Sequence, residues 1–113
     1  MRLKKIFCYG TLQQTSTQIE LIGRELTGDI SSIDGYIILR DYIDPEDGIA
    51  YPRIVEHHFG CVFGTIFEFT DDEVKILDEY ETDMYIRKEI LTKDGYKVYI
   101  YLPSYKVGTY KLL

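Results

Sequence analysis

Apolar and polar residues along this 113-residue chain alternate or form short apolar runs over most of its length, a pattern that predicts strands. β-branched and aromatic residues are frequent in these segments, and polar residues with glycine or proline separate them. The chain is therefore expected to be rich in strands. The expected strands cover residues 5–9, 25–30, 36–40, 61–69, 84–92 and 96–102, and residues 51–55 resume an extended pattern.

Two segments have helical periodicity instead. The clearer one begins at Thr70, which is followed three residues later by Glu73, the spacing of a capping box, with acidic residues throughout the first turn. A short apolar face follows. A second helix is expected over residues 15–22, ending at Gly23 because glycine favours a helix C-terminus.

The segments between these elements have the chemistry of turns and loops. Residues 31–35 and 57–60 are expected to be turns. Asp94 and Gly95 form the dipeptide that is typical of a two-residue type I′ hairpin. Residues 41–51 are expected to form an exposed loop, and whether this loop is a lid stays open.

About six strands and two short helices fit one domain covering residues 1–113. So many strands in so short a chain favour a strongly twisted or closed antiparallel sheet with the helices appended. Gly64, inside a predicted strand, indicates a bulge or the close approach of another backbone.

Composition and charge limit the binding partners and the location that are expected for this protein. A net charge of -6 removes the attraction on which binding to nucleic acid or to an anionic membrane depends, so neither is expected. No secretory signal precedes the first strand and no apolar run approaches membrane-spanning length, so a cytoplasmic protein is expected. Cys8 and Cys61 lie in apolar runs and are expected to be buried reduced thiols, while a single disulfide stays open.

Several well-known site patterns do not match. The two cysteines and the adjacent His57 and His58 have no zinc-ligand spacing, so no metal is expected. No histidine is tied to Cys8 by a motif, which favours packing over nucleophilic chemistry. Gly10 allows a sharp turn after the first strand. The segment that follows it lacks the second glycine and the Lys-Ser/Thr pair of a P-loop. The backbone N–H groups that follow this strand could still form an anion-binding concavity.

Four carboxylates lie within six residues where the helix that begins at Thr70 gives way to a strand: Asp78, Glu79, Glu81 and Asp83. Junctions of this kind lie at the rim of a scaffold, where functional side chains are frequent. A solvated, acidic helix end is the alternative, because acidic side chains are mostly exposed.

Short motifs also follow one another in order along residues 5–103. A first strand ends in Tyr-Gly-Thr-Leu, a Tyr-Pro pair follows, then a strand with an internal glycine, then Leu-Asp-x-x-Glu and Tyr-x-Arg. In this order they resemble the γ-glutamylcyclotransferase-like family, which includes the γ-glutamylamine cyclotransferases and the AIG2-like proteins. The matching residues are Tyr9, Gly10, Thr11, Leu12, Tyr51, Pro52, the strand at 61–69, Leu77, Asp78, Glu81, Tyr85 and Arg87.

The resemblance implies an α+β fold: a small mixed, mostly antiparallel β-barrel of about six strands flanked by two or more short helices, with a cavity at one end. It implies an enzyme that releases an amine or amino acid from a γ-glutamyl compound and cyclises the glutamyl part to 5-oxoproline. The partner would be a small-molecule γ-glutamyl substrate, with no cofactor, and the protein would be a monomer or a homodimer. The leaving amine stays open.

The same resemblance makes Glu81 the general acid/base and the loop Tyr9, Gly10, Thr11 and Leu12 the binding site for the glutamyl group. The chemistry agrees, because the α-amine of the substrate closes a five-membered ring and needs only one carboxylate to take up and return a proton. Partial burial should raise the pKa of that carboxylate.

Tyr51 and Tyr85 are candidates to line the pocket, with ordinary barrel packing as the alternative. Arg87 is expected to be an ion-pairing strand residue. A non-catalytic small-molecule binding module on the same scaffold is the alternative function, because a fold does not fix an activity.

Overall fold

The computed structural model describes residues 3–43, 50–81 and 85–103. Side chains are described except for those of residues 40–43, 50–53 and 103. In chain order the elements are β1 (Lys4–Cys8), the 3₁₀ helix η1 (Thr11–Gln13), α1 (Thr15–Ile22), β2 (Asp29–Ile43), β3 (Ala50–Phe69), α2 (Asp71–Glu81), β4 (Tyr85–Leu91) and β5 (Lys97–Pro103).

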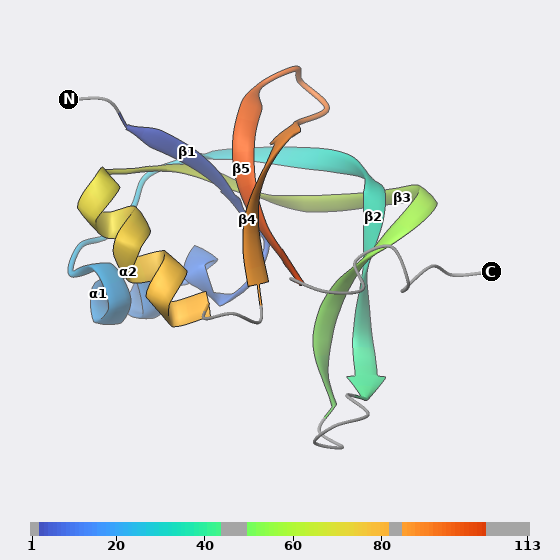
Figure 1. Cartoon of the computed structure of the whole chain (residues 1–113), viewed down its shortest axis with the longest axis horizontal. Helices are drawn as coiled ribbons and strands as arrows, with labels where there is room; N and C mark the ends of the chain where they lie inside the picture. Colours follow the sequence, from blue (N-terminus) through green and yellow to red (C-terminus); the bar gives the residue numbers. More distant parts are fainter. Residues whose placement is uncertain (1–2, 44–49, 82–84, 104–113) are drawn as a thin grey trace.

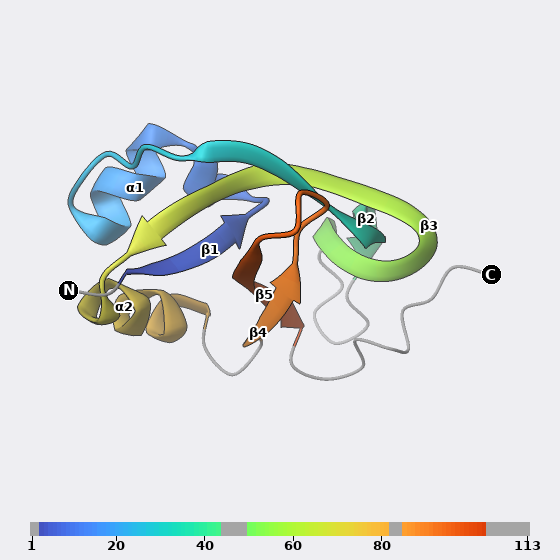
Figure 2. The same ribbon diagram turned by 90° about the horizontal axis from the view of Figure 1, so that it is seen from above.

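The strands form one curled, five-stranded sheet in the order β2-β3-β1-β5-β4. β1 pairs in parallel with β5, and the other described pairings are antiparallel. Both helices lie together beside β1, while the long β2–β3 ribbon bends away from them and curls round (Figures 1 and 2). The expected α+β fold, mixed and mostly antiparallel with flanking helices, is confirmed as a half-barrel.

The described strands number five rather than about six, because two expected turns are not turns. Residues 31–34 pair with residues 64–61 as part of β2, and the register shifts around Gly35, whose φ is +90°. Residues 57–60 lie opposite this shift, so both strands bend together without reversing (Figure 1). Turn-forming residues thus produced a bulge, since a long partner strand was available to pair with them.

The predicted loop at 41–51 is also shorter than expected. β2 runs to Ile43 and β3 begins at Ala50, and Tyr42 pairs with Tyr51. Residues 44–49 lie outside the described part of the chain, and with them the question of a lid.

Both helix predictions are confirmed at their ends. α1 ends at Gly23, whose φ of +87° places it in the left-handed region, and whose N–H donates to the carbonyls of Gln18 and Ile19. α2 begins with a full capping box. The backbone N–H of Glu73 donates to Thr70 Oγ1 at 3.2 Å, and the N–H of Thr70 donates to Glu73 Oε1 at 2.9 Å.

The β4–β5 hairpin has a different turn from the one predicted. Leu91 pairs with Lys97, and the N–H of Thr92 donates to the carbonyl of Tyr96. The N–H of Gly95, at φ +90°, donates to the Thr92 carbonyl at 3.0 Å. The loop therefore has three residues with glycine last, the geometry of a turn followed by a glycine bulge.

β1 separates two apolar clusters. Ile6 and Cys8 belong to the cluster beneath the helices, which also contains Val74 and Leu77 of α2. Phe7 points to the other side, into a cluster made by strands alone. Gly64 of the neighbouring β3 allows close approach, as predicted, because a Cβ there would lie 2.5 Å from the Cys8 carbonyl oxygen.

Both cysteines are free, and the prediction that both are buried is wrong for Cys61, which is exposed. It lies next to the bend of the β2–β3 ribbon, where the strand faces solvent. Within the described ranges, no helix has the length and apolar character that crossing a membrane requires.

Candidate active site

A cavity of about 480 Å³ opens where the end of β1 meets the helices and the β4–β5 hairpin. Its wall combines the end of β1 and the segment that follows it, both helices, and one residue from each of the other four strands. The lining residues are Phe7, Cys8, Tyr9, Gly10, Thr11, Leu12, Thr17, Leu21, Ile38, Ile54, Leu77, Tyr80, Glu81, Tyr85 and Tyr101.

Six of the seven site residues expected from the sequence lie around this one cavity. The loop Tyr9, Gly10, Thr11 and Leu12 forms one part of the wall, and Glu81 and Tyr85 form another, although they come from the far half of the chain. The side chain of Tyr51 lies outside the described side chains, so its role stays a prediction.

The loop after β1 is held by side chains rather than by sheet pairing. Tyr9 Oη donates to the carbonyl of Tyr101 at 2.7 Å. The Gly10 carbonyl accepts the backbone N–H and Nε2 of Gln13, both at 3.2 Å. Because η1 begins at Thr11, the first N–H groups of this turn have no preceding carbonyl of the helix to bind.

Gln18 anchors this loop and was missed from the sequence. Its side chain is only 2% exposed. Nε2 donates to the Leu12 carbonyl at 2.9 Å, and Oε1 accepts the N–H of Leu26 at 2.8 Å. The available signal was its position: residues 18, 21 and 22 share one face of a helix, so a glutamine there points inward with the apolar residues.

Gly10 has a φ of -121° and a ψ of -145°, so its φ lies outside the left-handed region that favours glycine. A Cβ at Gly10 would meet no protein atom within 4 Å. Since Gly10 lines the cavity, the missing side chain leaves open space there.

Glu81 is the last residue of α2 and is partly buried. Burial raises the pKa of its carboxyl group above the usual range. The negative end of the helix dipole acts in the same direction, because it disfavours an anion at a helix C-terminus. Among the described residues that line the cavity, Glu81 is the only carboxylate.

Cys8 lies on the same cavity but is not suited to nucleophilic chemistry. Burial raises the pKa of its thiol to about 12, and the charge of Glu81 adds to the effect. The thiol therefore stays neutral, in agreement with packing rather than attack. Across the described residues, no three acidic, histidine or cysteine side chains come together as a metal site.

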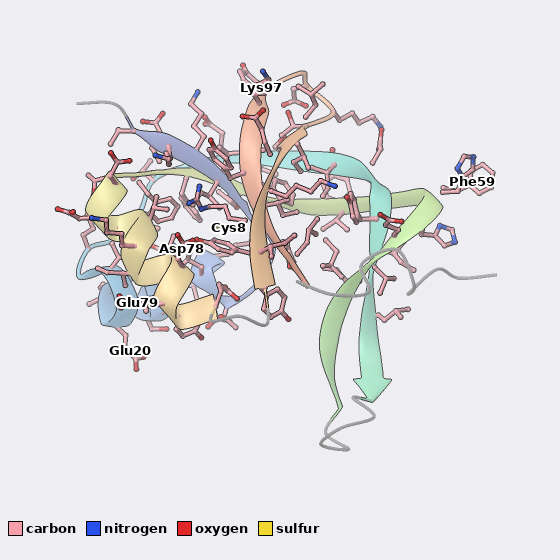
Figure 3. All side chains as sticks on the ribbon, viewed as in Figure 1. Cys8, Glu20, Phe59, Asp78, Glu79 and Lys97 are labelled. Atoms are coloured by element: carbon pink, nitrogen blue, oxygen red, sulfur yellow. The ribbon has the colours of Figure 1, made fainter. Side chains whose placement is uncertain are left out.

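The other acidic residues near Glu81 are placed differently. Glu79 is exposed, and Asp78 forms an ion pair with Arg87, whose Nε lies 3.2 Å from Oδ1. The prediction that Arg87 is an ion-pairing strand residue is confirmed. Figure 3 shows Asp78 and Glu79 along α2, at the opposite end of the molecule from Phe59 on the bend of the β2–β3 ribbon.

Most of the chain is similar in sequence to a known protein family. The family model described as gamma-glutamyl cyclotransferase, AIG2-like, matches residues 6–111. This chain belongs to the AIG2-like γ-glutamyl cyclotransferase family. The match covers both the loop after β1 and the end of α2, the two parts of the cavity wall that the sequence motifs indicated.

Individual proteins are also similar to this chain in sequence or in structure. AIG2-like protein C of Arabidopsis thaliana is 33% identical over 86 residues, which are 75% of this chain and 47% of the relative. The chain thus spans about half the length of that relative. The solution structure of an Arabidopsis thaliana protein has a TM-score of 0.75 at 26% identity, and the match covers 94% of this chain and 72% of that one. A structure named gamma-glutamyl cyclotransferase has a TM-score of 0.69 at 15% identity, over 90% of this chain and 67% of its own, and shows the shared fold.

Proposed function

We propose that this member of the AIG2-like γ-glutamyl cyclotransferase family cyclises the glutamyl part of a γ-glutamyl amine or amino acid to 5-oxoproline and releases the amine. One observation carries the proposal: Glu81, with its raised pKa, shares a cavity with the loop Tyr9, Gly10, Thr11 and Leu12. The cavity volume of about 480 Å³ lies within the ~300–1,000 Å³ typical of small-molecule sites.

The reaction needs little beyond a folded substrate conformer and one proton carrier. The α-amine nitrogen attacks the γ-carbonyl carbon, the amide bond to the leaving amine breaks, and the five-membered lactam forms without consuming water. One proton leaves the attacking nitrogen and one reaches the departing nitrogen. Glu81 would accept the first and return it, which a carboxylate with a raised pKa does efficiently near neutral pH.

The loop after β1 would hold the substrate. Its backbone N–H groups are placed at the start of η1, where donors are available for a carboxylate or for the developing oxyanion. The open space at Gly10 would let the substrate approach the backbone closely. Leu12 is fixed by Gln18, so this arrangement is formed before the substrate arrives.

The test uses a panel of γ-glutamyl amines and γ-glutamyl amino acids. For each compound, both the formation of 5-oxoproline and the release of the free amine or amino acid are measured. Activity should survive exhaustive treatment with a chelator. The matched control is the same substrate with its α-amine acetylated, which should bind but should not cyclise, because its nitrogen is no longer a nucleophile.

Two results would refute the proposal. Turnover of the acetylated substrate would mean that the α-amine is not the nucleophile. Binding of γ-glutamyl compounds without turnover of any of them would identify a binding module instead.

A further inference from the structure

Asp78 lies three positions before Glu81, so both side chains emerge from neighbouring positions on one face of α2. Three hydrogen bonds converge on the Asp78 carboxylate. Tyr101 Oη donates to Oδ1 at 2.6 Å. Arg87 donates through Nε to Oδ1 at 3.2 Å and through its second terminal nitrogen to Oδ2 at 3.3 Å. The pairing with Arg87 is therefore of the forked type that fixes geometry as well as charge.

These bonds tie the end of α2 to both strands of the C-terminal hairpin. Arg87 belongs to β4 and Tyr101 to β5. Arg87 is itself held in place, because its guanidinium group lies 5.1 Å from the centre of the Tyr99 ring. The anchor for the last turn of α2 is therefore a pair of side chains that have little freedom of their own.

The same link reaches the opposite wall of the cavity. The Tyr101 side chain is only 8% exposed and lines the cavity. Its backbone carbonyl accepts the Tyr9 hydroxyl at 2.7 Å. A continuous chain of contacts therefore runs from Asp78 through Tyr101 to the residue directly before Gly10. This series of contacts connects the last turn of α2, which contains Glu81, to the loop after β1.

The pKa values of the two carboxylates on this helix face are also shifted in opposite directions. The pKa of Asp78 is lowered, because the hydrogen bonds from Arg87 and Tyr101 outweigh the effect of burial. The pKa of Glu81 is raised by burial. Burial and the bond to Asp78 also raise the pKa of Tyr101, so its hydroxyl stays a donor to Asp78. The environment of Asp78 thus favours its ionised form, whereas that of Glu81 favours the protonated form.

We propose that Asp78 is a positioning residue for Glu81: through Tyr101 and Arg87 it holds the last turn of α2 against the β4–β5 hairpin and so fixes Glu81 opposite the loop Tyr9, Gly10, Thr11 and Leu12. The catalytic part of this inference rests on the proposed function. A misplacement of about 1 Å costs up to ~10²-fold in rate, so the anchor matters even though Asp78 does not line the cavity.

The activity test uses Asp78→Asn, which keeps the side-chain shape but removes the charge. We expect kcat to fall by about 10–100-fold while KM changes by less than about twofold. Tyr101→Phe keeps the ring in the cavity wall and removes the donated hydrogen bond, so it should lower kcat in the same way. It also tests the proposal if Asp78→Asn does not fold.

Asp71→Asn is the matched control. It breaks the ion pair between Lys4 Nζ and Asp71 Oδ1, 2.7 Å apart, which joins the other end of α2 to β1. Its kcat should equal that of the parent.

A second comparison separates positioning from a general structural effect. In a Glu81→Gln background, Asp78→Asn should change the residual rate by less than about twofold, because it acts through a carboxylate that is already absent. A parent-like kcat in Asp78→Asn, or a further tenfold loss in the Glu81→Gln background, would overturn the proposal.

An arm that needs no turnover keeps the two proposals distinguishable. Amide hydrogen exchange of residues 77–81 should be about tenfold faster in Asp78→Asn than in the parent, and unchanged in Asp71→Asn. If no γ-glutamyl compound is turned over, the proposed function fails, while this exchange measurement still decides the anchor. Unchanged exchange at the end of α2 in Asp78→Asn would show that Asp78 does not hold that turn.

Discussion

Replacing Glu81 by glutamine is the most direct perturbation of the proposed chemistry. The substitution keeps the size of the side chain and one hydrogen-bond acceptor but removes the ability to take up a proton. General acid–base catalysis contributes ~10²–10⁴-fold, which at roughly 1.4 kcal/mol per tenfold corresponds to about 3–5.5 kcal/mol of transition-state stabilisation. Glu81 is the only carboxylate among the described lining residues, so none of the other described lining residues can take over its proton transfer.

The expected result is therefore a fall in kcat of ~10²–10⁴-fold with binding of a γ-glutamyl ligand retained. The assay is 5-oxoproline formation at matched protein concentration, with circular dichroism to establish that the variant is folded. Glu79→Gln is the control, because Glu79 lies on the same turn of α2 but is exposed. Residues two positions apart on a helix point about 200° apart around its axis, so Glu79 faces away from Glu81. Full activity of Glu81→Gln, or loss of activity in Glu79→Gln instead, would refute the assignment.

Stability should move in the opposite direction from activity. Burial raises the pKa of Glu81 in the folded protein above its value in the unfolded chain. Ionised Glu81 thus destabilises the fold: the penalty is absent below the unfolded pKa, grows as the pH rises through the folded pKa, and is full above it. Glutamine carries no such penalty, so Glu81→Gln should melt at or above the parent's temperature at neutral pH, with the difference disappearing in acid. A large drop in melting temperature would contradict this reasoning.

Three further predictions concern the loop, the sheet and the helix. Gly10→Val should lower turnover far more than melting temperature, because a Cβ there meets no protein atom within 4 Å; near-parent turnover would show that this part of the loop does not contact substrate. Gly64→Ala should lower the free energy of unfolding by about 1–3 kcal/mol, measured by urea denaturation, since its Cβ would lie 2.5 Å from the Cys8 carbonyl oxygen, and an unchanged midpoint would contradict that contact. Thr70→Ala should cost about 1 kcal/mol in the same assay and Thr70→Ser much less, because serine retains the hydroxyl that caps α2; equal losses would point to the methyl group instead.

The parts of the fold that could be predicted are those with local causes. The capping box at Thr70 and the left-handed glycine at position 23 each specify one helix end, and α2 begins and α1 ends where these signals indicate. The β2–β3 ribbon could not be predicted in this way. Whether residues 31–35 turn or bulge depends on the partner strand, which is distant in sequence, and the residue types suit both outcomes.

In the candidate site, too, some features could be predicted from the sequence and others could not. The residues Tyr9 to Leu12 and Glu81 could be named from ordered motifs that resemble a family, although nothing in their spacing brings them together. The hydrogen bonds of two polar side chains beside the cavity, Gln18 and Asp78, were not predicted, although Asp78 was among the matching motif residues. Gln18 looks like an ordinary helix residue until its two buried hydrogen bonds are seen, and the contact of Asp78 with Tyr101 joins residues 23 positions apart.

The position of Glu81 at the very end of α2 gives a physical reason for the proposed anchoring. A terminal residue of a helix has fewer hydrogen bonds in its own turn than an interior one, so it is the least constrained place on that element. It is also the place where a carboxylate is nearest to the negative end of the helix dipole, which together with burial favours the protonated form. The position at the helix end that would suit Glu81 to proton transfer therefore also leaves it less constrained. In the proposal above, the hydrogen bonds that Asp78 accepts one turn earlier, from Arg87 of β4 and Tyr101 of β5, supply the constraint that the helix end lacks.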